Sequence, residues 1–215
     1  MLVLKLGGSL MHDPLLPDWL ALCAEAGRGR LVLVPGGGAF ADAARAAQAH
    51  WQVDDVRAHN MAVLGMAQFA HLLHGIEPRL QLADGATAIR DALRGGRTAL
   101  WLPTELQRRR ADELTSWDVS ADSLAAWLAL QLGAQGLALL KSCALPPRED
   151  DGCDWSALAA DGIVDRRFPD YAQACSRAGM QVEVLTRDAL EHLRALLSAP
   201  DPAPAAGARP ASPRA

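Results

Sequence analysis

Apolar residues follow two different spacings along this chain. Short apolar runs, such as residues 31–34, end in Gly or Pro, and this pattern predicts buried β-strands. We expect strands at residues 2–6, 31–35, 80–83, 98–102, 137–141 and 181–185. In the segments between them, apolar residues recur every three or four positions, which predicts helices at residues 15–26, 39–50, 56–74, 86–94, 122–132, 170–178 and 187–197.

The alternation of strands and helices predicts an α/β fold. Near-continuous apolar strands need cover on both faces, so we expect a three-layer α/β/α sandwich with a mainly parallel central sheet. A single domain should occupy residues 1–198, since this length suits one core. Residues 199–215 are rich in Pro and Ala and lack large apolar residues, which predicts a disordered tail.

Composition and charge exclude several classes of partner. The formal net charge is -4 and the sequence pI is about 5.8, so the chain has no field that would attract nucleic acid or an anionic membrane. No apolar stretch reaches transmembrane length, and the chain begins with a strand pattern rather than a signal peptide. We expect a cytoplasmic protein that binds neither nucleic acid nor membrane.

The first candidate site follows the first predicted strand and contains Lys5, Gly7, Gly8 and Ser9. Glycines let the backbone approach an anion and turn N–H groups toward it, while the lysine adds a full charge. The spacing matches neither a Walker A loop nor a dinucleotide-binding fingerprint. These residues therefore either bind phosphate or form only a tight turn into a helix.

Three consecutive glycines, Gly36, Gly37 and Gly38, follow the second predicted strand and precede a helix. Such a run is conformationally costly, so anion binding explains it better than a simple connection. In a parallel sheet, ligands gather at the carboxyl ends of the strands. We expect both glycine loops to line one crevice, where a phosphoryl donor and its acceptor could be aligned.

A third segment, residues 116–126, has the pattern of a loop that enters a helix. Ser120 is a natural N-cap, and Asp122 in the first turn complements the helix dipole. Capping alone explains both residues. The alternative is that Asp122 accepts hydrogen bonds from lysines and holds their ammonium groups toward a transferring phosphoryl group.

Together, the Lys5 to Ser9 motif, the glycine triplet and residues 120–126 resemble the amino acid kinase family in order and spacing. The similarity extends over residues 2–197. It implies an ATP-dependent phosphotransferase that uses Mg²⁺, acts on a small anionic acceptor and forms a homo-oligomer.

The same resemblance implies roles for individual residues. It implies that the catalytic residues are Lys5, Asp122 and Lys141. The ATP phosphates would be bound by Gly7, Gly8 and Ser9, and the acceptor by Gly36, Gly37 and Gly38. His59, at the start of the predicted helix 56–74, either contacts polar groups of the acceptor or is a helix-end side chain satisfied by water or backbone. Asp118, in the loop before Asp122, is a further candidate for contact with the acceptor. We expect no metal held by the protein, because His71 and His74 could share a helix face but lack further ligands.

The sequence departs from the family after Gly162, where a second catalytic lysine is expected but arginines occur. Lys141, Arg166 or Arg167 could supply that second cation. Arginine binds phosphate well but is not a simple replacement for lysine.

A narrower resemblance, to the kinases of methanofuran biosynthesis, rests on residues 102–103, 108–112, 116–126, 164–165 and 168–169. Those enzymes phosphorylate [5-(aminomethyl)furan-3-yl]methyl phosphate to a diphosphate. The resemblance therefore implies a phosphomonoester acceptor. The alternatives are a family member that acts on isopentenyl phosphate or a carboxylate, and a nucleotide-binding protein of this fold that has lost transfer.

Overall fold

The computed structural model describes residues 1–146 and 153–198. Its centre is a six-stranded sheet in the order β3-β4-β2-β1-β5-β6, in which every neighbouring pair is parallel. The strands are β1 (Leu2–Leu6), β2 (Leu31–Pro35), β3 (Gln81–Ala83), β4 (Ala99–Trp101), β5 (Gly136–Lys141) and β6 (Gln181–Thr186).

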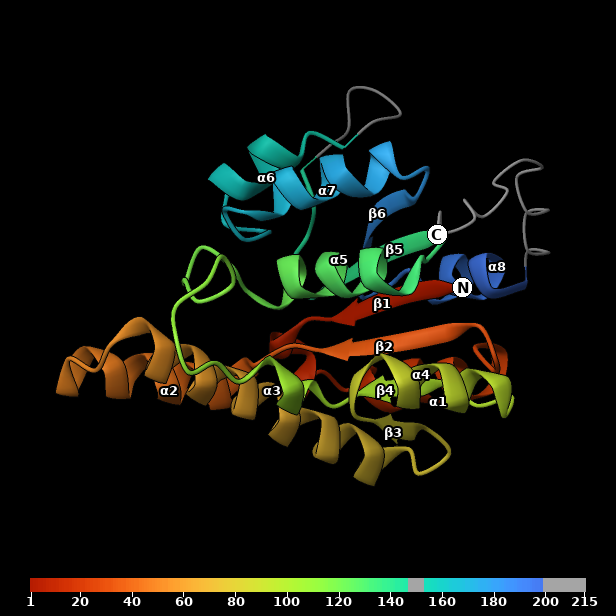
Figure 1. Ribbon diagram of the computed structural model, residues 1–215. Helices are drawn as coiled ribbons and strands as arrows, with labels where there is room; N and C mark the ends of the chain where they lie inside the picture. Colours follow the sequence, from red (N-terminus) through yellow and green to blue (C-terminus); the bar gives the residue numbers. More distant parts are fainter. Residues whose placement is uncertain (147–152, 199–215) are drawn as a thin grey trace, which may run out of the picture.

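Helices connect the strands and cover the sheet (Figure 1). The α-helices are α1 (Leu16–Ala26), α2 (Gly38–Trp51), α3 (Asp55–Ile76), α4 (Gly85–Arg94), α5 (Ala121–Leu132), α6 (Trp155–Ala160), α7 (Phe168–Arg177) and α8 (Leu190–Ser198). Two short 3₁₀ helices, η1 (Gly8–His12) and η2 (Pro103–Leu106), follow β1 and β4. Figure 1 shows the α2–α3 hairpin projecting beyond the sheet at the left.

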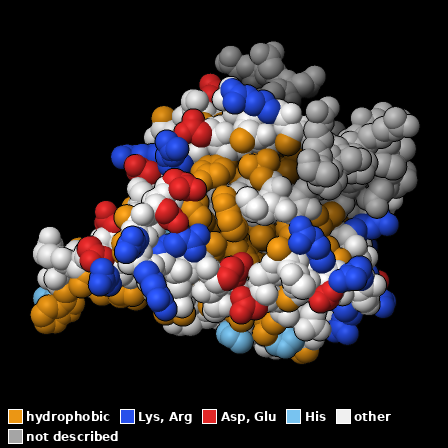
Figure 2. Space-filling view, viewed as in Figure 1, with side chains coloured by type: hydrophobic (Ala, Val, Ile, Leu, Met, Phe, Trp, Pro, Cys, Tyr) orange, Lys and Arg blue, Asp and Glu red, His pale blue; other side chains and the backbone are white. Residues whose placement is uncertain are grey.

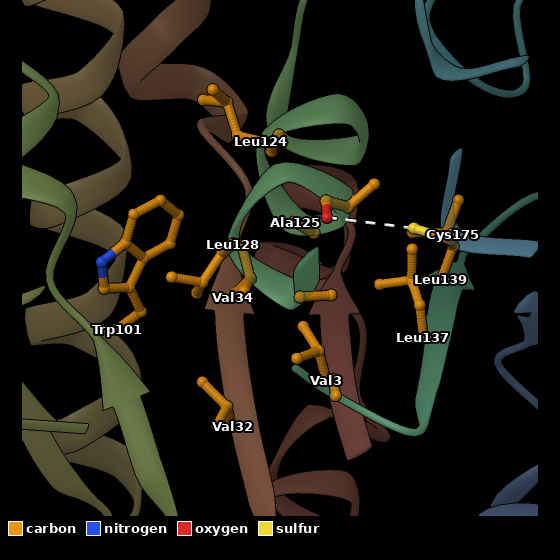
Figure 3. Packing of buried hydrophobic residues seen from close by; sticks show 14 of the residues in the cluster. Val3, Val32, Val34, Trp101, Leu124, Ala125, Leu128, Leu137, Leu139 and Cys175 are labelled. Atoms are coloured by element: carbon orange, nitrogen blue, oxygen red, sulfur yellow. Dashed lines mark hydrogen bonds between the residues drawn. The ribbon is translucent and has the colours of Figure 1, made fainter. Parts of the chain in front are cut away.

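The side chains of successive residues in each strand lie on opposite faces of the sheet. On one face, valines of β1 and β2 and leucines of β5 pack with Leu124, Ala125 and Leu128 of α5 (Figure 3). On the other face, Leu4 and Leu33 pack in a second cluster with α1, α8 and the second half of α3. Each fully buried Leu or Val contributes about 1.5–3 kcal/mol relative to exposure, so both faces hold the helices firmly.

The predicted fold class is confirmed, and each predicted strand is found within a residue or two of its expected ends. The helix predicted at 187–197 begins only at Leu190, because the chain first forms a turn after β6 in which Ala189 N donates to the carbonyl of Thr186 at 3.0 Å. Helix α6 was not predicted, since it is too short for a clear periodicity; the Asp154 side chain caps it. The prediction for residues 199–215 lies outside the described residues.

Charged side chains of both signs are interspersed on the face shown in Figure 2, around a hydrophobic band over α5. That face therefore carries no broad basic or acidic field. Within residues 1–146 and 153–198, no helix is both long and apolar enough to cross a bilayer.

Candidate functional site

The sheet brings two lysines together at the carboxyl ends of adjacent strands. Lys5 lies near the end of β1, and Lys141 ends β5, its parallel neighbour. Lys5 has the same parity as Val3, and Lys141 the same parity as Leu139, so both side chains lie on the sheet face that α5 covers. Chain connections leave β1 and β5 toward opposite sides of the sheet, and such a switch point is where open α/β sheets form ligand crevices.

Asp122, in the first turn of α5, lies between these lysines. Its Oδ1 is 2.9 Å from Lys5 Nζ, and Lys141 Nζ donates to Oδ1 and Oδ2 at 2.9 and 2.7 Å. The side chains are only 7%, 10% and 4% exposed for Lys5, Lys141 and Asp122. The cluster therefore holds two ammonium groups and one carboxylate almost out of contact with water.

Two positive charges against one negative charge leave this buried cluster with a net positive charge. Burial and the charge of Lys5 together lower the pKa of Lys141 to about 8, against the attraction of Asp122. Burial alone would raise the pKa of Asp122, but the two lysines outweigh it and hold that pKa below its ordinary value. An anion bound here would neutralise the excess charge and relieve the cost of burying it.

The two glycine loops touch each other backbone to backbone beside this cluster. A Cβ added to Gly8 would lie 2.2 Å from the nitrogen of Gly38, and one added to Gly36 would lie 2.4 Å from the nitrogen of Gly8. Gly38 also has a φ of 52°, which side-chain-bearing residues adopt rarely. The prediction that the two loops line one crevice agrees with this contact.

A carboxylate from a distant loop fixes the start of α5. Asp165 accepts hydrogen bonds from the backbone N and Oγ of Ser120, both at 2.8 Å, and from those of Ser123 at 3.0 and 2.5 Å. Ser120 is the N-cap, as predicted, and its Oγ accepts from Asp122 N at 3.4 Å. Asp165 thereby positions the helix turn that carries Asp122.

A pocket of about 180 Å³ opens next to the cluster, between the α2–α3 hairpin and the start of α5. Lys5 and the glycine loops form one end of it. Its remaining walls are mostly small and apolar, from Ala62, Val63, Met66, Val119 and Leu124. This pocket is therefore suited to a small ligand with an anionic group at one end.

An aromatic and cationic bridge spans the wall of this pocket. The guanidinium carbon of Arg45 lies 4.3 Å from the ring centre of Trp117, and Trp117 Nε1 donates a hydrogen bond to Gln48 Oε1. Arg45 and Gln48 lie one turn apart on α2, and Arg45 also pairs with Asp42 at 3.0 Å. This bridge joins α2 to the loop before α5 and places a second cation at the pocket.

The structure places the other predicted residues unevenly. His59 lines the pocket, and its Nε2 donates to the carbonyl of Leu106 at 3.0 Å. Ser9 Oγ lies 2.7 Å from Ser142 Oγ, directly beyond Lys141. The Asp118 side chain, by contrast, pairs with Arg166 at 3.5 Å, and its neighbours Trp117 and Val119 line the pocket instead.

The three candidates for the second cation differ in burial and in their partners. Lys141 belongs to the buried cluster, whereas the side chain of Arg166 is 83% exposed and Arg167 pairs with Asp170 at 3.2 Å. Arg108, in the segment 108–112 that carries the narrower resemblance, pairs with Asp112 at 2.5 Å. Three residues of this region carried no predicted site role: Asp165, Arg45 and Ser142.

The site offers little to a metal held by protein alone. In the described parts of the chain, no group of three or more His, Cys, Asp or Glu side chains is arranged around a common point. The carboxylate of the cluster, Asp122, is already engaged by both lysines. A Mg²⁺ ion would therefore be held chiefly through the phosphates of a bound nucleotide, as is usual for this ion.

Comparisons with known proteins show the family and the fold. The sequence model described as "Amino acid kinase family" matches residues 1–144. No curated protein matches the sequence. Among solved structures, the chain is similar to a uridylate kinase from Archaeoglobus fulgidus, with a TM-score of 0.66, 14% identity and coverage of 91% of this chain and 94% of that one.

Two further structures resemble the chain. A UMP kinase from Bacillus anthracis has a TM-score of 0.64 at 13% identity, with 91% of each chain covered. An N-acetylglutamate synthase from Neisseria gonorrhoeae has a TM-score of 0.57 at 20% identity, with 91% of this chain and 56% of that one covered. At these identities the likeness concerns the fold.

Proposed function

Because this chain belongs to the amino acid kinase family, we propose that it transfers the terminal phosphoryl group of ATP to a small phosphomonoester. The observation that carries the proposal is the buried cluster of Lys5, Asp122 and Lys141, which has a net positive charge at the carboxyl edge of the sheet. Phosphoryl transfer requires mainly alignment and neutralisation of charge, and this cluster supplies both.

ATP fits the side of the crevice formed by the first glycine loop and the end of β5. Gly7 and Gly8 would expose backbone N–H groups to its phosphates, and the hydroxyls of Ser9 and Ser142 lie next to that position. When bound, ATP supplies the phosphoryl group, and Mg²⁺ on its phosphates offsets their negative charge. Lys5 and Lys141 would hold the transferring oxygens, while Asp122 keeps both ammonium groups directed at them.

The acceptor would occupy the pocket beside Gly36, Gly37 and Gly38. A phosphomonoester already carries a nucleophilic oxygen anion, so no general base is required. One of its oxygens would form a bond to the terminal phosphorus of ATP while the bond to the bridging oxygen breaks and ADP leaves. Lys5 lines this pocket as well as belonging to the cluster, so it can contact both reacting groups.

For the acceptor itself we favour (aminomethyl)furanmethyl phosphate, giving the diphosphate used in methanofuran biosynthesis. The mostly apolar walls of the pocket suit a small ring, and Arg45 with Lys5 suits the phosphate. The alternatives are isopentenyl phosphate or a carboxylate as acceptor, and a nucleotide-binding protein of this fold without transfer activity.

The test is ATP consumption by the purified protein with Mg²⁺ and a panel of acceptors. The panel contains the furanmethyl phosphate, isopentenyl phosphate, a carboxylate such as N-acetylglutamate, and UMP, because UMP kinases share the fold. We expect turnover with the furanmethyl phosphate and its loss in Lys5→Ala. Turnover with a different acceptor alone would keep the kinase and reject the furan, and tight ATP binding without turnover would reject the kinase.

A further inference from the structure

The segment that joins η2 to α5 forms one wall of the proposed acceptor pocket. This wall segment, residues 107–120, is an irregular run of turns, and Trp117 and Val119 near its end line the pocket. In Figure 1 it leaves the sheet beside α3 (light green), extends to the left and turns back to the start of α5. An irregular segment takes its shape from the partners of its backbone groups, so those partners determine where Trp117 lies.

Asn60 of α3 holds the beginning of the wall segment. Its Nδ2 donates to the carbonyl of Arg108 at 2.8 Å, and its Oδ1 accepts from the backbone N of Arg108 at 2.7 Å. A carboxamide presents a donor and an acceptor side by side, so it satisfies both backbone groups of one residue. One residue earlier, His59 Nε2 donates to the carbonyl of Leu106. Two consecutive residues of α3 therefore clamp the chain where it enters the wall segment.

Hydrogen bonds are needed for this attachment because α3 and the wall segment pack incompletely beside it. A hollow of about 20 Å³, with room for about one water molecule, separates three residues of the helix from three of the segment. Its walls are Asp55, His59 and Ala62 on one side and Ser116, Trp117 and Val119 on the other. Close packing normally fixes the distance between two elements. Here the hollow leaves that task largely to the clamp.

The clamp reaches the pocket through a stiff turn. Arg108 pairs with Asp112 at 2.5 Å. The Asp112 carboxylate accepts from Leu114 N at 3.0 Å, and the Asp112 backbone N donates to Thr115 Oγ1 at 2.8 Å. Leu114 and Thr115 are both buried. A displacement of Arg108 is therefore transmitted along the turn to Trp117.

Asn60 belongs to the same helix as another wall of the pocket. Ala62 and Val63, which follow it closely on α3, line the pocket to which the wall segment contributes Trp117 and Val119. The two hydrogen bonds of Asn60 thus join two elements whose separation determines how wide the pocket is.

We propose that Asn60 is a positioning residue that sets the width of the acceptor pocket, a proposal that rests on the proposed function of that pocket. Its carboxamide is engaged by the backbone of Arg108, so Asn60 acts through the wall segment. The ATP side of the crevice is built instead from the first glycine loop and the end of β5. Loss of the clamp should therefore weaken binding of the acceptor and leave binding of ATP unchanged.

Hydrogen exchange of the wall segment is the first measurement, because it needs no substrate. In Asn60→Ala, the amides of residues 107–120 should exchange about tenfold faster than in the unaltered protein, since two hydrogen bonds are lost. Asn60→Asp should have at least the same effect, because it sets a carboxylate oxygen against the carbonyl of Arg108. Gln68→Ala removes an exposed carboxamide from the same helix and is the matched control. Unaltered exchange rates in Asn60→Ala or in Asn60→Asp would overturn the clamp.

Steady-state kinetics test the consequence for the pocket, with ATP and the acceptor that gives the fastest turnover. In Asn60→Ala, KM for the acceptor should rise about tenfold while KM for ATP and kcat stay constant. In a Trp117→Leu background, the same substitution should raise KM for the acceptor less than about threefold, because the wall residue that it displaces is already absent. Equal rises in both KM values, or a tenfold rise retained in Trp117→Leu, would overturn the proposal.

These experiments separate the role of Asn60 from the proposed function. If the unaltered protein transfers phosphate to no acceptor, the proposed function is rejected and a role for Asn60 in acceptor binding falls with it. If the unaltered protein is active but Asn60→Ala leaves KM for the acceptor unchanged, only the role of Asn60 is rejected. Circular dichroism of each variant establishes that it is folded.

Discussion

Cationic side chains gather at both ends of the strands, the carboxyl edge and the amino edge of the sheet, but their environments there are opposite. At the carboxyl edge, Lys5 and Lys141 are buried and share the single carboxylate of Asp122. At the amino edge, Arg28, Arg79 and Arg97 line a larger cavity of about 290 Å³.

The arginines of the amino edge are exposed and already satisfied. Arg79 forms two hydrogen bonds with Glu77 through its side chain, at 2.8 and 2.6 Å. Arg97 donates to the carbonyl of Arg79, and Arg28 donates to that of Gly96. Neither the number of cations nor the cavity volume therefore distinguishes the proposed anion site; the uncompensated charge kept from water does.

The sharpest test of this comparison removes the carboxylate from each edge. Asp122→Asn leaves two buried ammonium groups without their counter-ion, so kcat should fall about 100-fold or more and the free energy of unfolding by about 3 kcal/mol. Glu77→Gln should leave kcat unchanged. Steady-state kinetics and urea unfolding measure both variants, and equal losses of kcat at the two edges would contradict the distinction.

A smaller effect is expected from the loop that positions α5. Asp165→Ala removes four hydrogen bonds from the turn that carries Asp122, so kcat should fall about 30-fold, equivalent to about 2 kcal/mol. The Asp165 carboxylate also raises the pKa of Lys141, so the alkaline limit of activity should move to lower pH in this variant. Asp170→Ala, which removes an exposed partner of Arg167, is the control, and it should change neither quantity.

The buried lysine also predicts a pH dependence. Since burial and Lys5 lower the pKa of Lys141 to about 8, its ammonium form is lost as the pH rises through that value. We expect kcat/KM for ATP to fall about tenfold per pH unit above pH 8. Lys141→Arg keeps its positive charge at all accessible pH values, so its kcat/KM should not fall above pH 8, although its kcat can be lower. If kcat/KM of this variant still falls above pH 8, the titrating group is a different residue.

The smallest effect should come from the pocket wall. Arg45→Gln removes a half-exposed cation and its contact with Trp117, and KM for the acceptor should rise about fivefold while KM for ATP stays constant. Arg97→Gln, at the amino edge, should alter neither. A rise in KM for ATP in Arg45→Gln would place this residue on the donor side instead.

Much of the fold could be predicted because its signals are local. The strand of residues 31–35 is apolar on both faces, and the helix from Ala121 to Leu132 begins at a capping serine. The proximity of Lys5 and Lys141 was not readable from spacing, since it depends on β5 pairing with β1 across more than half of the chain. Only the family resemblance brought them together before the structure did.

Asp165 and Arg45 were not predicted as site residues, and the physical reason is the same for both: their roles depend on tertiary contacts. Asp165 acts on Ser120 and Ser123 from a loop more than forty positions away, and no local pattern marks a carboxylate that caps a remote helix. Arg45 has the sequence context of an ordinary exposed helix position, and only the packing of Trp117 against it gives it a place at the pocket. Asp118 was expected near the acceptor, but its turn directs the flanking residues inward instead.

The backbone contact between Gly8, Gly36 and Gly38 limits how this scaffold can diversify. Any side chain at Gly8 or Gly36 would push the two loops apart, so the donor and acceptor ends of the crevice cannot be reshaped separately there. Variation in substrate choice must arise in the α2–α3 hairpin and in the segment around Trp117, where side chains already line the pocket. Under the proposed function, evolutionary freedom is thus concentrated on the acceptor side of the site.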